Sequence, residues 1–377
     1  MAHVDIGIVC HAVFRGAESV YGPAHSLFEG VRALGRTAFL LEHSLETAEP
    51  SRLSLDGAAP SAAPGSRAWP GILRHAADSR CTRQVVRRHS AGFLVAVDPL
   101  CFLHVRLAVG KRVPVVFYGA DYAERRFRNP ILNGVYQALD RHAARRAAAV
   151  WSVSEAIRDL RRRQGVPDSH NVVLPNAPEF DPALPARPEE IRGDLALLAN
   201  LDAGLDTELV AAAFAAVAAA RPDAVLHVVG DGRLRPALAA RLAAAGLSGR
   251  VRFHGHLPRP EALAVVARCR VALAVYAADC AWHAYRDSVK VRDYAAAGVP
   301  VVSTPGHGLC AAIEQAGFGR VAADAPSVAA AALAWLSDPA AAAAARRRAL
   351  EFAQAHSRGR LLRRALATVD AGGGGAR

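Results

Sequence analysis

The stretch "YRDSVKVRDYAAAGVPVVSTP", residues 285–305, joins a charged segment to a short apolar run through the turn Gly298-Val-Pro300. Its spacing predicts a helix from Ser288 to Ala297. The apolar run Val299 to Val302 then predicts the next strand. A surface helix alone does not need this turn, and a core strand alone does not need the charged residues ahead of it. The stretch therefore indicates a β/α repeat whose helix and loop carry a binding function.

Within the predicted helix, Lys290, Asp293 and Tyr294 share one face, because they lie three and four residues apart. The strand is followed by a glycine-containing loop, residues 303–308, and then by a helix near Cys310. A helix start preceded by glycines presents free N–H groups, which suit a diphosphate. A nearby lysine adds positive charge, and a carboxylate accepts hydrogen bonds from a ribose diol. The alternative is an exposed Lys–Asp pair on a surface helix followed by a routine turn.

Outward from this stretch, strands and helices alternate through both halves of the chain. Residues 175–190 carry five prolines and no periodicity, as is typical of a linker. We expect a first domain over residues 1–178, a linker over 179–193, a second domain over 194–350, and a carboxy-terminal helix with a disordered tail over 351–377. Residues 45–67, rich in Ser, Pro, Ala and Gly, predict a poorly ordered loop.

Two successive β/α sets joined by a linker predict two doubly wound, Rossmann-like α/β domains that face each other across a cleft. In such sheets the ligand lies beyond the carboxyl ends of the strands. The first candidates for a site are therefore the residues at or just after predicted strand ends: Gly16, Gly22, Asp98, Tyr118, Gly119, Asp121, Gly230, Asp231, His256 and Ser303.

The composition narrows the function classes. The 377 residues carry a formal net charge of +12, supplied almost entirely by arginine. Solvated helix faces explain such a charge, and so does attraction to anionic phosphates or to an anionic membrane surface. Nucleic-acid binding is disfavoured, because basic residues are not interleaved with aromatic ones and no zinc-finger spacing occurs.

The cysteines and the apolar runs bear on the compartment. The six cysteines form no CxxC pair and mostly lie in apolar segments, so we expect free, buried thiols in a reducing cytoplasm. The first residues, "MAHVDIGIVCHAV", predict a strand rather than a signal peptide. No apolar run approaches the length needed to span a bilayer. We therefore expect a cytoplasmic protein, with peripheral membrane association left open.

The opening stretch resembles the "P-x-K-x-x-E-Y-x-A-x-G-x-P-V-V" signature of GT-B fold glycosyltransferases, in particular the glycosyltransferase family 4-like group. The likeness extends to "LHVVGDGRLRPALAARLAAAGLSGRVRFHGHLP" before it and to "VYGPAHSLFEGVRALG" and "FYGADYAERRF" in the first half. It covers most of the chain from Tyr21 onward, with a gap at residues 45–90. The resemblance implies the GT-B fold, in which the last helix commonly crosses back to the first domain.

The resemblance also implies roles for individual residues. Asp293 stands where the family usually has a glutamate that binds the nucleotide ribose, and Lys290 matches the lysine near the diphosphate. Asp121 matches an acidic position at the acceptor side and, with Lys290, is the catalytic candidate. The remaining donor-binding candidates match the phosphate loop, the base-side segment, the glycine turn and the ends of neighbouring elements: Gly22, Gly230, Asp231, His256, Leu257, Arg286, Ser288, Ser303, Thr304, Gly306 and Gly308.

The sequence departs from the family pattern in three respects. Tyr285 stands where a related E-x7-E pattern has an acid, and Asp293 is one methylene shorter than the usual glutamate. The first loop of the second domain, "NLDAGLDTEL", lacks the Arg and Lys that the family often has there. A diphosphate would therefore depend on Lys290, Arg286 and backbone N–H groups.

No metal is expected from the motifs. The chain has no D-x-D triplet, and its fifteen histidines show no H-E-x-x-H motif or Cys/His cluster with ligand spacing. We expect His104, His142 and His283 on the surface or in the core rather than as ligands. His11 and His25 lie near the predicted cleft, where either could contact the acceptor.

Taken together, the residues and the resemblance predict a metal-independent glycosyltransferase that uses a nucleoside diphosphate sugar, of UDP, GDP or TDP type, and no other cofactor. The acceptor would be a hydroxyl of a glycan, a lipid-linked sugar or a natural product, and the resemblance implies retention of anomeric configuration. Two alternatives stay open: a nucleotide-sugar epimerase of the same fold and a non-catalytic GT-B partner protein.

Overall fold

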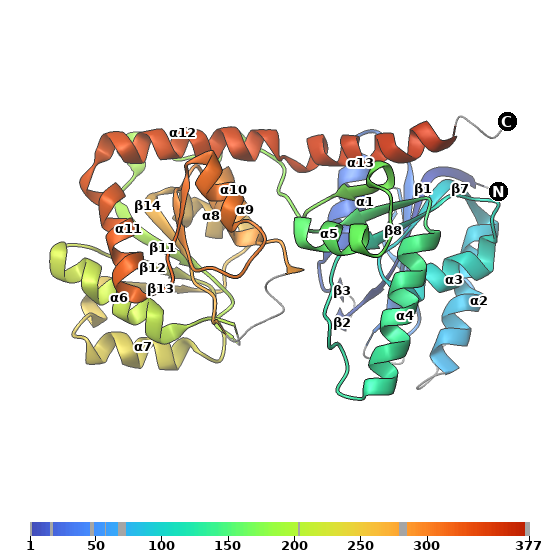
Figure 1. Cartoon of the computed structure of the whole chain (residues 1–377), viewed down its shortest axis with the longest axis horizontal. Helices are drawn as coiled ribbons and strands as arrows, with labels where there is room; N and C mark the ends of the chain where they lie inside the picture. The colour runs from blue at the N-terminus through green and yellow to red at the C-terminus, as the bar shows by residue number, and fades with distance from the viewer. Residues whose placement is uncertain are drawn as a thin grey trace. The chain divides into compact units, whose positions relative to one another are not determined.

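The computed structural model contains two sheets of mainly parallel strands, each with helices on both faces (Figure 1). It describes residues 2–15, 18–45, 49–56, 58–66, 73–202, 204–278 and 285–373. The chain divides into two compact units. The first comprises Met1–Asn176 and Arg358–Arg377, and the second comprises Ala177–Ser357. The predicted fold class of two parallel-sheet α/β domains is confirmed.

The sheet of the first unit has the strand order β10-β9-β8-β7-β1-β4-β5-β6. All strands from β10 to β4 run parallel, and β5 and β6 extend the sheet in antiparallel fashion. The strands are β1 (Ala2–Ala12), β4 (Ala38–Ser44), β5 (Arg52–Leu55), β6 (Ser61–Ala62), β7 (His89–Ala96), β8 (Val115–Gly119), β9 (Ala149–Ser152) and β10 (Asn171–Val173), with a separate hairpin of β2 (Phe14–Arg15) and β3 (Glu18–Ser19).

Each strand of this sheet serves two cores, because successive side chains point to opposite faces. On one face, Val9, Leu41 and Leu94 pack among the apolar residues of α2, α3 and α4. The other face is covered by α1, α5 and α13. The helices of this unit are α1 (Pro23–Ala33), α2 (Leu73–Arg88), α3 (Pro99–Val109), α4 (Pro130–Arg146), α5 (Glu155–Arg163), the short η1 (Asp168–His170) and α13 (Arg358–Gly373).

The poorly ordered loop predicted for residues 45–67 is wrong for part of that range. β5 pairs with β4, and Leu53 is buried in the core. The Arg-Leu-Ser-Leu alternation of β5 is the signal of a strand with one face on the core, but it is only four residues long and sits among turn-forming residues. Residues 46–48, 57 and 67 lie outside the described residues.

The second unit is wound in the order β13-β12-β11-β14-β15-β16, and all its strands run parallel. The chain order reverses between β11 and β14, which makes the gap between their carboxyl ends the topological switch point of this sheet. The strands are β11 (Gly193–Leu198), β12 (Leu226–Val229), β13 (Val251–Gly255), β14 (Cys269–Ala274), β15 (Val301–Ser303) and β16 (Gly319–Val321).

Alternation along the strands again divides the core of this unit in two. Leu195 and Leu197 face one layer, formed by α6, α7 and α11, whereas Ala196 faces the layer of α8, α9, α10 and α12. The helices are α6 (Thr207–Ala220), α7 (Arg235–Ala244), α8 (Arg259–Ala267), α9 (Val289–Ala296), α10 (Cys310–Ala316), α11 (Ala325–Ser337) and α12 (Pro339–Ala355), with the short η2 (Pro188–Glu190) and η3 (Ser248–Arg250).

The basic carboxy-terminal segment, expected as one long helix, forms two helices that belong to different units. Phe352 of α12 packs in the core of the second unit. In α13, Leu362 and Leu366 are buried, and α13 packs on α1 of the first unit. Gly30 of α1 allows the close approach, since a Cβ there would meet Leu362 at 3.0 Å. The apolar face of α13 is therefore part of the core of the first unit.

No single helix among the described residues is long and apolar enough to cross a membrane. The helical segments Ala325–Ser337 and Pro339–Asp370 together have the length and apolar composition of a membrane span, but they are bent by 102° relative to each other. The prediction of free cysteines is confirmed for Cys10, Cys81, Cys101 and Cys269, which are buried, and for the half-buried Cys310. Cys280 lies outside the described residues.

A buried ion pair in the first unit provides a test of this packing. Arg161 of α5 is fully buried, and its guanidinium binds both carboxylate oxygens of Asp140 on α4. We expect Arg161→Met to lower the free energy of unfolding by about 3 to 5 kcal/mol, because it leaves the Asp140 carboxylate buried without its partner. Arg162→Met, at the exposed neighbouring position, should change it by less than about 1 kcal/mol. Urea unfolding followed by circular dichroism measures both, and equal effects would contradict the assignment.

Candidate functional site

The candidate donor residues gather at the carboxyl edge of the second sheet, where all its strands end. The helix that carries Lys290 and Asp293 connects β14 to β15, so its amino terminus lies at this edge. Tyr276 follows β14 and Thr304 follows β15. The Tyr276 N–H donates to the Thr304 hydroxyl at 2.8 Å, and that hydroxyl donates back to the Tyr276 carbonyl at 3.2 Å. These bonds hold the two strand-end loops together beside the switch point.

The predicted helix 288–297 is confirmed as α9, and two tyrosines fix its position. Ser288 caps the helix, since its hydroxyl accepts from the Val291 N–H at 3.3 Å, and it also bonds the Tyr276 hydroxyl. Tyr294 is fully buried, and its hydroxyl accepts from the Leu198 N–H at 2.8 Å and donates to the Leu273 carbonyl at 2.9 Å. Tyr294 therefore joins α9 to the ends of β11 and β14, and it serves the core rather than a ligand.

Lys290 lies on the first turn of α9 with its ammonium 4.5 Å from the centre of the Tyr276 ring. This distance allows a cation–π contact. Loss of hydration lowers the pKa of Lys290 to about 8. The ammonium is thus still the main form at neutral pH, but it is poorly solvated, which favours a bound anion as its partner.

Asp293 is buried, and its carboxylate forms an ion pair with Arg259 at the start of α8. Burial raises the pKa of Asp293, and the Arg259 guanidinium opposes that shift. Sequence reasoning missed Arg259, which lies in α8, whereas Asp293 lies in α9 beyond β14. A second pair, Asp287 with Arg292, is also buried, with nitrogen and oxygen 2.8 Å apart, and it anchors the start of α9 from below the surface.

The loop after β15 is tied to the protein by its own polar groups. The buried Ser303 hydroxyl bonds the Ala274 carbonyl at 3.1 Å and the His307 ring at 2.7 Å. The hydroxyls of Ser303 and Thr304 thus hold the loop in shape. The N–H of Gly308 bonds the Arg286 carbonyl at 3.5 Å. Gly306 takes a positive φ of 105°, a conformation that suits glycine.

The loop after β12 is built around two glycines with positive φ. A Cβ on Gly230 would lie 1.9 Å from the Ala199 carbonyl oxygen, and one on Gly232 would lie 2.4 Å from that of Leu201. Both glycines are therefore required by the close approach of the loop after β11. Asp231 is exposed and bonds the Gly232 N–H and the Arg235 side chain, each at 2.8 Å.

The neighbouring strand end, after β13, presents His256 and Leu257. His256 is exposed and Leu257 is half-buried. Because β13 is the edge strand beside β12, both residues lie at the same carboxyl edge as the glycine turn.

A basic side chain from another loop contacts the loop after β11, whose own sequence contains no basic residue. Arg233, from the β12–α7 connection, bonds Asp202 through its backbone N–H at 3.2 Å and its side chain at 3.0 Å. Its side chain remains highly exposed. Arg233 was not predicted, because nothing in the local sequence indicates that its loop meets the loop after β11. Arg286, which was predicted, is exposed beside α9.

Of the proposed donor-binding and catalytic residues, Gly22 and Asp121 belong to the first unit. Gly22 is the N-cap of α1, and its N–H donates to the His25 ring at 3.1 Å. Asp121 follows β8 and forms an exposed ion pair with Arg126, with oxygen and nitrogen 3.2 Å apart. Gly16 lies outside the described residues.

A pocket of about 610 Å³ lies elsewhere in the second unit. It is lined by residues at the starts of the strands of the second sheet, including Gly193, His227, Arg252 and Cys269. This is the amino-terminal edge, opposite the candidate donor residues. The pocket therefore belongs to a different part of the unit from the donor site.

Two family models match the chain. The model described as "Glycosyl transferase 4-like domain" matches residues 23–177, and the model described as "Glycosyl transferases group 1" matches residues 195–338. The first match falls in the first unit except for its last residue, and the second match falls in the second unit. No curated protein sequence matches the chain.

Several solved structures share the fold at low sequence identity. HepE of Anabaena, solved with UDP, aligns with a TM-score of 0.71 and 14% identity over 97% of this chain and 100% of that one. Sucrose-phosphate synthase of Thermosynechococcus elongatus aligns with a TM-score of 0.69 and 15% identity over 97% of this chain and 98% of that one. WaaG, a glycosyltransferase involved in lipopolysaccharide biosynthesis, aligns with a TM-score of 0.63 and 17% identity over 96% of this chain and 98% of that one. These likenesses extend over both units and identify the GT-B fold.

The lowered pKa of Lys290 is open to direct measurement. The chain contains two lysines, Lys290 and the exposed Lys111, so a protein labelled with ¹³C-lysine gives two side-chain signals. We expect the Lys290 signal to titrate with a midpoint near the pKa of about 8 that desolvation causes. Lys290→Ala assigns the signals by removing one. A Lys290 midpoint at the ordinary value of a solvated lysine would show that its ammonium is not desolvated.

Proposed function

Because the chain belongs to the GT-B glycosyltransferases that join a glycosyl transferase 4-like domain to a glycosyl transferases group 1 domain, we propose that it transfers a sugar from a nucleoside diphosphate sugar to a hydroxyl acceptor. The observation that carries the proposal is the position of the half-buried Lys290, whose ammonium lies 4.5 Å from the centre of the Tyr276 ring at the carboxyl edge of the second sheet, beside the topological switch point. A cation in that position suits a diphosphate, which carries the negative charge of the leaving group.

The donor fits this edge in chemical terms. In our proposal Lys290 contacts the diphosphate, and exposed Arg233 supplies positive charge that the loop after β11 lacks. Asp293 accepts hydrogen bonds from the ribose, with Arg259 keeping its buried carboxylate ionised. His256 and Leu257 lie beside the base. UDP is the first donor nucleotide to test, since HepE was solved with UDP and with UDP-glucose, and GDP and TDP follow.

The chemistry we propose needs little from the protein beyond charge and position. The departing diphosphate develops negative charge as the glycosidic bond breaks, and Lys290 stabilises it. In a retaining reaction of the kind the family resemblance implies, the leaving phosphate accepts the proton of the acceptor hydroxyl. Asp121, on the first unit, is the proposed acceptor-side carboxylate, and its pairing with Arg126 keeps it oriented. A basic surface would also draw the enzyme to an anionic membrane that presents a lipid-linked acceptor.

Binding of the nucleotide tests the role of Lys290. We expect Lys290→Ala to raise the Kd for UDP about 10- to 100-fold, because a charge-assisted hydrogen bond contributes about 1.5 to 3 kcal/mol. Lys111→Ala is the matched control and should bind UDP like the wild type. Affinity should also fall as the pH rises through about 8, where free Lys290 loses its proton. Calorimetric titration measures the Kd for UDP of the wild type at several pH values and of both variants. If neither UDP, GDP nor TDP binds the wild type, the chain is a non-catalytic member of the family.

Asp293 allows a separate test that distinguishes binding from folding. Asp293→Asn should weaken UDP binding about 10-fold or more, but lower the free energy of unfolding by less than about 1 kcal/mol, because the Arg259 side chain is 54% exposed and is rehydrated when its partner is lost. Asp287→Asn is the contrasting variant, since its side chain is only 2% exposed and its partner Arg292 is buried. It should destabilise the fold by about 3 kcal/mol. An unfolded Asp293→Asn protein would give Asp293 a structural role.

The donor alone, incubated with the enzyme, separates transfer from its nearest rival. An epimerase changes the sugar of a nucleotide sugar without an acceptor, whereas a transferase leaves it unchanged until an acceptor hydroxyl is added. We therefore expect slow or no conversion of UDP-sugars alone, and nucleotide release that rises when glycan or lipid-linked acceptors are supplied. Epimerised nucleotide sugar in the acceptor-free reaction would overturn the proposal.

A further inference from the structure

A second group of polar side chains gathers at the switch point of the first sheet. β1 lies between β4 and β7, and the chain order reverses between β1 and β7, so ligand sites are expected beyond the carboxyl ends of these two strands. His11 stands near the end of β1, and Asp98 follows β7. Around them lie side chains of β4, α2 and α3, and we call this group the imidazole cluster: His11, His43, His75, Asp78, Asp98, Cys101 and His104.

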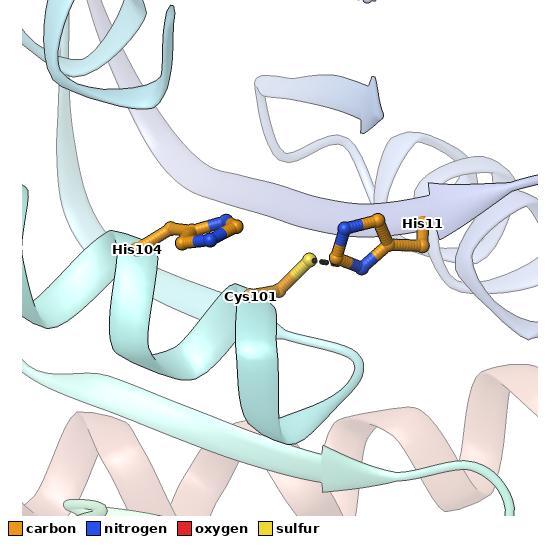
Figure 2. Close-up of side chains that lie close together, drawn as sticks. All are labelled: His11, Cys101 and His104. Carbon is orange, nitrogen blue, oxygen red and sulfur yellow. Dashed lines mark hydrogen bonds between the residues drawn. The ribbon is translucent and has the colours of Figure 1, made fainter. Parts of the chain in front are cut away.

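The rings of the cluster are close to one another. The centre of the His11 ring lies 6.3 Å from that of His75 and 6.0 Å from that of His104, and the rings of His75 and His104 are 5.8 Å apart. Figure 2 shows His11, from β1, facing Cys101 and His104, from α3. His11, His75 and Asp78 bring ligand atoms within 4.8 Å of one another, and so do His11, Cys101 and His104.

Four of these residues have a buried polar atom without a hydrogen-bond partner in the described part of the chain. These atoms are Nε2 of His11, Nδ1 of His75, Oδ2 of Asp78 and Nδ1 of His104. His104 is 2% exposed and Asp78 is 4% exposed, so water outside the protein does not reach them readily. An unpaired buried polar atom is costly, and four in one cluster call for a common partner.

The other members of the cluster are satisfied, which sets the four apart. His43 bonds the Ser51 hydroxyl through Nδ1 and the Thr82 hydroxyl through Nε2, each at 2.9 Å, so it is a packing residue. Nδ1 of His11 lies 2.8 Å from the Asp98 carboxylate, which also accepts from the Cys101 N–H at 2.8 Å as the cap of α3. This carboxylate–imidazole contact directs Nε2 of His11 toward Asp78, whose Oδ2 is 3.8 Å away.

We propose that His11, His75, Asp78 and His104 bind one divalent transition-metal ion of the zinc class. Three imidazoles and one carboxylate form a ligand set typical of zinc, whereas magnesium and calcium prefer oxygen ligands alone. Asp98 is then the outer carboxylate that orients a metal-bound histidine. Cys101 lies on the other side of the ring, with its sulfur 3.3 Å from Nδ1 of His11, which Asp98 already holds.

Three of the four proposed ligands, His11, His75 and Asp78, already bring ligand atoms within 4.8 Å of one another. Zinc binds nitrogen at about 2.0 to 2.1 Å, so neighbouring ligand atoms of a tetrahedral ion are about 3.3 Å apart. The 3.8 Å gap between Nε2 of His11 and Oδ2 of Asp78 is close to that value, and a ligand atom of His75 lies within 4.8 Å of both residues. His104, which groups with His11 and Cys101, would have to turn toward them to complete the set. The ion would join β1, α2 and α3 at the carboxyl edge of the first sheet. It would therefore add to the stability of this unit, since the unfolded chain has no preformed site.

The metal content of the full-length protein, prepared without a polyhistidine tag, tests the proposal. We expect about one zinc per chain by mass spectrometry after desalting, a higher melting temperature with zinc than with EDTA, and no such rise with magnesium. Cobalt in place of zinc should give the strong visible absorption of a tetrahedral site. A wild-type protein that binds no zinc, or whose melting temperature is the same with zinc and with EDTA, would overturn the proposal.

Variants separate this site from zinc bound elsewhere on a chain with fifteen histidines. His75→Ala, at a half-buried position, and His104→Ala should each lose the bound zinc and the cobalt absorption, whereas exposed His142→Ala should keep both. Asp98→Asn, which keeps the cap of α3, should weaken zinc binding about 10- to 100-fold. A cooperative melting transition in EDTA shows whether each variant folds. If His104→Ala does not fold, the zinc content of His75→Ala decides whether the proposed site binds zinc. Zinc retained by His75→Ala at the affinity of the wild type would overturn the assignment.

Discussion

The hydroxyl of Tyr294 is the contact on which the geometry of the donor edge depends. It bonds the main chain at the ends of β11 and β14, so it fixes α9 at the switch point of the second sheet. Because α9 is held there, Lys290 lies over the Tyr276 ring and Asp293 meets Arg259. A residue that is itself inaccessible to ligand thus sets the position of those that are proposed to bind it.

The polar groups around this edge are largely engaged with one another. The hydroxyls of Ser303 and Thr304 form hydrogen bonds with neighbouring loops, and the hydroxyl of Ser288 caps α9. Such bonds reduce the reorganisation that a bound ligand requires, which is a condition for electrostatic stabilisation of a leaving group. The charges that remain for a diphosphate are then the side chains of Lys290 and the exposed arginines. A chain whose positive charge is almost entirely arginine uses one of its two lysines here.

The two sheets obey the same topological rule with different chemistry. In the second sheet the switch point is bordered by a lysine, arginines and glycine turns, which suit an anion. In the first sheet it is bordered by imidazoles and carboxylates, which suit a cation. His11 and Asp98 reach this position because β1 and β7 are adjacent and parallel, so that their carboxyl ends coincide.

Local pattern was sufficient for much of this protein. The alternation of apolar strands with helices determined the two α/β domains, and the motif around Lys290 determined the family and the helix α9, because both depend on neighbouring residues. β5, the break between α12 and α13, Arg233 beside Asp202, and Arg259 beside Asp293 were not predictable in this way. The imidazole cluster is the clearest case: its members show no metal-ligand spacing along the chain, and only the packing of β1, α2 and α3 brings their side chains together. Contacts between residues distant in sequence are decided by tertiary packing, which local periodicity does not encode.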